Sequence, residues 1–107
     1  MEHLNTSGID ATFDVAADTD GIPEIRLGGE LDISNVDAFR AALRPVMALD
    51  PRTIVFDLGR LSFMDSSGIA VLLEVAQRVS VVEIRQPTPV IRRIIEATGL
   101  TEILRLS

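Results

Sequence analysis

Four consecutive small residues, Asp65 to Gly68 (Asp-Ser-Ser-Gly), form the part of the sequence whose side chains could do chemistry. An apolar β-branched run from Thr53 to Phe56 precedes them and is typical of a buried strand. Apolar residues at helical spacing follow them: Ile69, Leu72, Leu73 and Ala76. Asp65 or Ser66 can cap this helix, and the positive end of a helix favours a phosphate. Ser66 and Ser67 are therefore candidates for a modification switch.

The sequence offers no catalytic base for these serines. A nucleophilic serine needs a base, and the only histidine, His3, lies in residues 1–8, a short polar segment that we predict to be a flexible tail. The Asp-Ser-Ser-Gly run has one serine more than the loop of an aspartic protease, and no second copy supplies another carboxylate. We therefore expect no enzyme.

The sequence also lacks the residues of a receiver domain, a P-loop and a metal site. Asp57 stands at the end of the predicted third strand, as the phosphorylated residue of a receiver domain does, but the chain has no lysine for a receiver or a P-loop. Asp57 is expected to cap or solvate the strand end. Without cysteine or clustered histidine, we expect no metal and no cofactor.

Charge and composition argue against a nucleic-acid-binding protein and against a membrane-spanning one. The net charge of −6 argues against nucleic acid, and residues 1–77 carry 5 Arg against 13 Asp and Glu, which suggests a partner with basic contact residues. No window approaches the ~20 apolar residues of a membrane span. No signal peptide is visible and cysteine is absent, so we expect a cytoplasmic protein with one domain over residues 9–107.

The first half of the chain predicts a hairpin and a crossover helix. Alternating residues 13–17 and 25–27 flank an Asp18–Gly21 turn, and Gly28-Gly29 is expected to end the second strand. Ser34 is the expected cap of the next helix, with Asp37 in a capping-box arrangement, and Pro45 should kink that helix or end it early. Its expected buried stripe is Val36, Phe39, Leu43, Val46 and Met47. A third strand is predicted over residues 53–58.

The second half predicts one more strand and one more clear helix. The fourth strand is expected over Val79 to Ile84. Thr88 caps the last helix, Pro89 takes its first position, and Gly99 ends it with Leu100 packed back. The helix has an apolar stripe of Ile91, Ile94 and Ile95, and Ile103, Leu104 and Leu106 are expected to pack in a C-terminal turn. The order predicts an α/β fold, a mixed sheet of about four strands covered largely on one face by three to four helices.

Three ordered motifs in this chain resemble those of the STAS domain, and specifically the stand-alone anti-sigma factor antagonists of bacteria. They are residues 61–69 (LSFMDSSGI), the Gly29–Asp32 run (Gly-Glu-Leu-Asp), and residues 87–100 as the last helix. The resemblance runs from about residue 9 to the end. One departure from the family is the segment around Arg78–Val82, where members have a longer second helix and a glycine-containing loop.

The resemblance implies a phosphorylation switch. The serine after the signature aspartate, which is Ser66 here, is phosphorylated in such proteins by an anti-sigma factor that is also a serine kinase and binds the ATP itself. A serine phosphatase would reverse this. Asp32, Asp65, Ser67 and Gly68 would support phosphotransfer or partner binding, with Gly68 allowing a partner or nucleotide to approach. The alternative is a non-switching STAS interaction subunit of a transporter or other signalling complex, in which Ser66 is only a cap.

Overall fold

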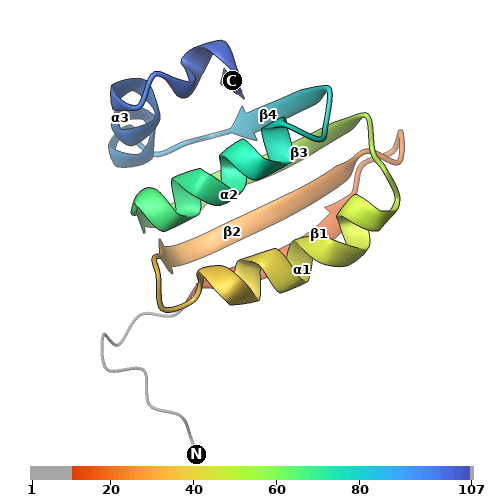
Figure 1. Cartoon of the computed structure of the whole chain (residues 1–107), viewed down its shortest axis with the longest axis horizontal. Coiled ribbons are helices and arrows are strands. Elements are labelled where there is room, and N and C mark those ends of the chain that lie inside the picture. The colour runs from red at the N-terminus through yellow and green to blue at the C-terminus, as the bar shows by residue number, and fades with distance from the viewer. Residues whose placement is uncertain (1–10, 107) are drawn as a thin grey trace, which may run out of the picture.

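The computed structural model describes residues 11–106, which form a five-stranded sheet and three α-helices (Figure 1). Chain order gives β1 (Thr12–Ala17), β2 (Pro23–Leu31), α1 (Val36–Ala48), β3 (Thr53–Met64), α2 (Ser66–Ala76), β4 (Val81–Arg85), α3 (Pro89–Ala97), the 3-10 helix η1 (Leu100–Glu102) and β5 (Arg105–Leu106). The predicted tail, residues 1–8 with His3, lies outside the described residues. The α/β class is confirmed, with a fifth strand in place of about four.

Strand order in the sheet follows chain order, β1-β2-β3-β4-β5. β1 and β2 are antiparallel and form the predicted hairpin, whose turn contains Gly21 at φ +79°. All later pairings are parallel, which requires a crossover connection between each pair of strands. The crossovers α1 and α2 lie side by side over the same face of the sheet (Figure 1).

The core fills the space between this face and the two helices. The predicted stripe of α1 is confirmed, since Val36, Phe39, Leu43, Val46 and Met47 are all buried. The Phe39 ring stacks on Phe13 of β1 at 5.4 Å and meets Phe56 of β3 edge to face at 6.0 Å. These contacts fix α1 against two strands, β1 and β3.

Both central strands are longer than predicted. β2 continues through Gly28 and Gly29 to Leu31, and β3 continues past Leu58 to Met64. The two extensions pair with each other, Gly28 with Arg60 and Gly29 with Leu61, through register shifts that accommodate Gly29 at φ +85°. The glycines thus mark irregularities within a pair of strands instead of an end. Asp57 consequently lies inside β3 and not at its end. Its Oδ1 accepts a 2.9 Å hydrogen bond from the Gly59 amide.

The start of α1 also differs from prediction. Ser34 does not cap the helix; the cap position is Asn35, which makes no side-chain capping bond, and Asp37 forms no capping box. Ser34 and Asn35 instead close the preceding turn, described with the site below. Pro45 does not end the helix, which continues to Ala48; Pro45 is exposed, so water can reach the carbonyl that it leaves without an amide.

The connection from α2 to β4 is short. β4 begins at Val81, two residues after the predicted start, because Val79 lies in the turn that follows α2: its amide donates to the Val75 carbonyl and its side chain is buried. Four residues, 77–80, therefore connect α2 to β4.

The C-terminal part largely follows prediction. The Thr88 side chain accepts from the Ile91 amide, Pro89 opens α3, and Gly99 follows the helix at φ +76°. Leu100 and Leu104 are buried, whereas Ile103 is 53% exposed and does not pack as expected. The unpredicted fifth strand pairs Arg105 with Glu83 and Leu106 with Ile84. No helix within residues 11–106 is long and apolar enough to cross a membrane.

Candidate functional site

The ends of β2 and β3 lie side by side and bring two distant loops together. Glu30 pairs with Phe63, Leu31 pairs with Met64, and the Asp65 amide donates a 3.1 Å hydrogen bond to the Leu31 carbonyl. The loop after β2, with Asp32, and the loop after β3, with the predicted phosphoacceptor, therefore leave the same edge of the sheet. In Figure 1 this is the edge at which both α1 and α2 begin.

Asp65 is the N-cap of α2, as one of the two predicted candidates. Its backbone is extended, and its Oδ1 accepts hydrogen bonds from the amides of Ser67 at 2.8 Å and Gly68 at 3.4 Å. Two of the unpaired amides of the first turn are thus already occupied by a carboxylate. Any further anion at this helix start has to share the site with Asp65.

Ser66 is the first residue of α2 and its side chain is exposed, whereas Ser67 is only half-exposed. Within residues 11–106 the Ser66 hydroxyl has no hydrogen-bond partner. A hydroxyl in this position is accessible to an enzyme that brings its own phosphate donor and base. No histidine lies among residues 11–106.

Asp32 is held in a closed turn at the same edge. Its Oδ1 accepts from the amide and the hydroxyl of Ser34, and these hydrogen bonds, the one from the hydroxyl first, lower the pKa of Asp32 below its ordinary value. Asp32 is consequently ionised at neutral pH. Asp32 directly follows Leu31, whose carbonyl accepts the hydrogen bond from the Asp65 amide.

Asn35 is a site residue that the sequence reasoning missed. Its Oδ1 accepts from the Asp32 amide at 2.9 Å, and its Nδ2 donates to the Glu30 carbonyl at 2.8 Å. One side chain therefore fastens the Asp32 turn to the end of β2. The Asp-x-Ser-Asn pattern, in which three side chains can bond to nearby backbone, is the signal that could have identified it.

Gly68 faces the inside of the protein. A Cβ at this position would lie 2.6 Å from Met64 Cγ and 2.8 Å from Leu31 Cδ2, closer than such atoms can approach. The close approach that Gly68 permits is therefore that of α2 to the ends of β2 and β3. Gly68 itself is buried.

Exposed apolar side chains belong to the segments around this edge. Ile33 follows β2 and is 75% exposed, Phe63 is the penultimate residue of β3, and Val90 lies in the first turn of α3. The start of α3 is tied to β3 by a 3.4 Å hydrogen bond from the Thr88 hydroxyl to the Leu61 carbonyl. Exposed apolar residues near polar and charged ones are typical of protein-binding surfaces.

Polar and apolar side chains of four segments thus lie around one edge of the sheet. No group of potential metal ligands occurs within residues 11–106. The edge offers an accessible hydroxyl, a capping carboxylate, a second fixed carboxylate and apolar side chains. We refer to Ile33, Asp32, Phe63 and the Asp65–Ser67 segment together as the switch edge.

Comparison with known proteins gives consistent matches. The family model of the STAS domain matches residues 15–107. The anti-sigma-F factor antagonist RsfB of Mycobacterium tuberculosis is 29% identical over 73 residues, 68% of this chain; the match spans 60% of RsfB, less than two thirds of its length.

Solved structures agree with this. An anti-sigma factor antagonist from Mycobacterium paratuberculosis superposes with a TM-score of 0.83 at 28% identity, covering 91% of this chain and 85% of that one. The antagonist SpoIIAA is 29% identical in both of its solved forms. The unphosphorylated form gives a TM-score of 0.76 over 90% of this chain and 88% of its own, and the phosphorylated form, from Bacillus, gives 0.69 over 90% and 91%.

Proposed function

The chain belongs to the STAS domain family, and from that membership we propose that it is a cytoplasmic anti-sigma factor antagonist switched by phosphorylation of Ser66. Unphosphorylated, it binds an anti-sigma factor of the serine kinase type, and the sigma factor is released. Phosphorylated, it dissociates from that partner. ATP is bound by the kinase, and a serine phosphatase restores the binding form.

The observation that carries this proposal is the position of Ser66. It is exposed, it opens α2, and it directly follows the capping carboxylate of Asp65. The relatives named anti-sigma factor antagonists support the partner class, and the structural likeness to SpoIIAA in both of its forms supports the switch.

The switch has a simple electrostatic basis. A phosphate adds roughly −1.5 to −2 charge at neutral pH. At Ser66 it would stand next to Asp65, whose Oδ1 already occupies the amides of Ser67 and Gly68. Those two amides are therefore not available to bind the phosphate, which stays at the surface near the loop of ionised Asp32. Like charges and a hydrated group inside a protein contact cost several kcal/mol of binding.

The fold should be unaffected by the same event. The Ser66 side chain is exposed and bonds to nothing within residues 11–106, so no internal contact is lost on phosphorylation. Negative charge at a helix N-terminus is also favourable to the helix. In this proposal Asp32 and Asp65 contact the kinase or assist phosphotransfer, Ser67 supports the helix start, and Gly68 sets the position of α2.

Affinity capture tests the partner class. Unphosphorylated protein, immobilised through its C-terminus, is used to capture partners from the bacterium that encodes it, with a Phe63→Asp variant as the matched control for the switch edge. We expect a serine kinase-type anti-sigma factor that is retained by the wild type and lost with the variant. Recovery of a transporter component without any such kinase would contradict the proposal and favour the non-switching subunit.

A further inference from the structure

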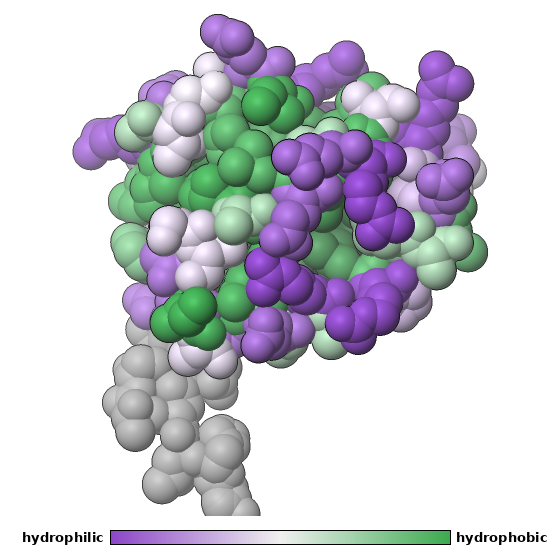
Figure 2. Space-filling model, in the orientation of Figure 1, coloured by the Kyte–Doolittle hydropathy of each residue, from purple (hydrophilic) through white to green (hydrophobic). Residues whose placement is uncertain are grey.

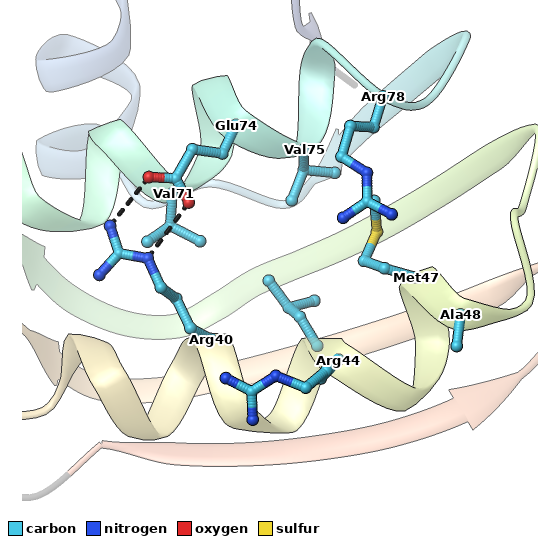
Figure 3. Close-up of a pocket in the computed structure, with 9 residues that line it drawn as sticks. Arg40, Arg44, Met47, Ala48, Val71, Glu74, Val75 and Arg78 are labelled. Atoms are coloured by element: carbon cyan, nitrogen blue, oxygen red, sulfur yellow. Dashed lines mark hydrogen bonds and ion pairs between the residues drawn. The ribbon is translucent and has the colours of Figure 1, made fainter.

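A groove with a volume of about 340 Å³ runs between α1 and α2, away from the switch edge (Figure 3). Its floor is apolar and consists of buried side chains from both helices: Leu43, Met47, Val71 and Val75. In Figure 2, hydrophilic side chains stand around a hollow with an apolar floor, in the region where Figure 1 places these helices. The groove is independent of the proposed function.

One arginine closes the groove at its end nearer the starts of the helices. Arg40 of α1 reaches across to Glu74 of α2, with hydrogen bonds of 3.1 Å from Nε and 2.9 Å from Nη2 to the two carboxylate oxygens (Figure 3). Hydrogen bonding to Arg40 lowers the pKa of Glu74 below its ordinary value. The negative charge of Glu74 is thus already paired with Arg40.

Two further arginines on the rim have no such partner. Arg44 of α1 and Arg78, in the turn that follows α2, are exposed, line the groove, and form no ion pair within residues 11–106. Glu74 is the only acidic residue in the lining. In a chain of net charge −6, this is a local concentration of positive charge above an apolar floor.

The aliphatic part of an arginine side chain commonly covers apolar surface, and that alone would explain arginines on the rim of an apolar groove. The arginine side chains here, however, do not fill the groove. Its volume falls in the range of about 300–1,000 Å³ that is typical of small-molecule pockets, which combine an apolar lining with a few orienting polar groups. The Arg40–Glu74 pair crosses between the helices, so a partner helix could not lie along the full groove without breaking it.

We propose that this groove binds a small amphiphilic anion, a carboxylate with an aliphatic chain. The chain lies on Leu43, Met47, Val71 and Val75, and the headgroup lies at the rim with Arg44 and Arg78. Guanidinium groups match carboxylates in geometry as well as charge. The overall negative charge of the protein makes non-specific attraction of such a ligand unfavourable, so saturable binding requires a local cluster of positive charge such as this one.

A titration of the full chain with octanoate, followed by amide chemical shifts, tests the proposal. We expect saturable shifts confined to residues 40–48 of α1 and to residues 71–78, which are the end of α2 and the turn after it. Octanol, which keeps the chain without the charge, and acetate, which keeps the charge without the chain, should both bind at least about tenfold more weakly.

Charge variants supply the matched control. The double variant Arg44→Glu and Arg78→Glu should weaken octanoate binding by about tenfold or more, while Arg93→Glu, an exposed arginine on α3, should leave it unchanged. The single variants Arg44→Ala and Arg78→Ala give the same test if the double variant does not fold. The proposal is overturned by shifts that do not saturate, by equal binding of octanol, or by an equal effect of Arg93→Glu. Capture of an acidic peptide with no octanoate binding would also overturn it.

Discussion

The backbone amide of Asp65 donates a 3.1 Å hydrogen bond to the carbonyl of Leu31. This bond extends the β2–β3 pairing by one step, from Leu31 opposite Met64 to the start of α2. It places the Asp32 turn beside the phosphoacceptor segment, although the two are far apart in sequence. The switch edge therefore depends on the register between β2 and β3.

Replacing Asp65 with alanine should remove the cap of α2. The variant loses the acceptor for the amides of Ser67 and Gly68, and we expect the free energy of unfolding in urea to fall by about 1 kcal/mol. Asp65→Asn keeps an acceptor oxygen and should retain most of that stability. Equal losses for the two variants would mean that the charge, and not the capping bond, stabilises the helix start.

Replacing Gly68 with alanine should destabilise the protein even though alanine favours helices. The added methyl group would lie 2.6 Å from Met64 Cγ and 2.8 Å from Leu31 Cδ2, so we expect a loss of about 1–3 kcal/mol in urea unfolding. Ala70→Gly, in the same helix, is the inverse control and should cost about 1 kcal/mol from helix propensity alone. A more stable Gly68→Ala protein would show that α2 can move away from the strands.

The Arg40–Glu74 pair predicts a carboxyl that titrates at low pH. The guanidinium stabilises the charged form, so the pKa of Glu74 should lie below the ordinary glutamate value of about 4.3. The stability that the pair contributes is present above that value and is lost as the pH falls through the lowered pKa of the folded protein. An NMR titration of the Glu74 carboxyl carbon measures it. Arg40→Ala should raise the pKa toward the ordinary value, and Arg44→Ala should leave it unchanged; no change with Arg40→Ala would contradict the pairing.

Local signals in the sequence predicted several elements correctly. The spacing of apolar residues identified every buried residue of α1, and Thr88, Pro89 and Gly99 marked the ends of α3 as their backbone chemistry requires. Asp65 was similarly recognised as a possible cap. These features depend on residues within one or two turns of each other, so the sequence alone contains the information.

The remaining differences arise from contacts between distant segments. Gly28 and Gly29 looked like a strand end, but pairing with β3 carries β2 through them. The two-residue β5 exists only because β4 offers it an edge. Near Asp32, hydrogen bonds to Glu30 and Asp32 fix Asn35 at the cap position of α1, where we expected Ser34. The sequence offered Asp32 and the Asp65–Gly68 run as candidate residues, and it is the β2–β3 register that brings them to one edge of the sheet.

The central claim is that phosphate on Ser66 switches partner binding. The most direct test measures the affinity of the captured anti-sigma factor for the protein before and after treatment with that kinase and ATP, with intact-mass and phosphopeptide analysis of the product. We predict one phosphate, on Ser66, and a loss of affinity of about a hundredfold or more, since every 1.4 kcal/mol is tenfold. Ser66→Ala should bind and never switch, and Ser67→Ala should switch normally. Phosphate on another residue, or unchanged affinity of the Ser66-phosphorylated protein, would contradict the account.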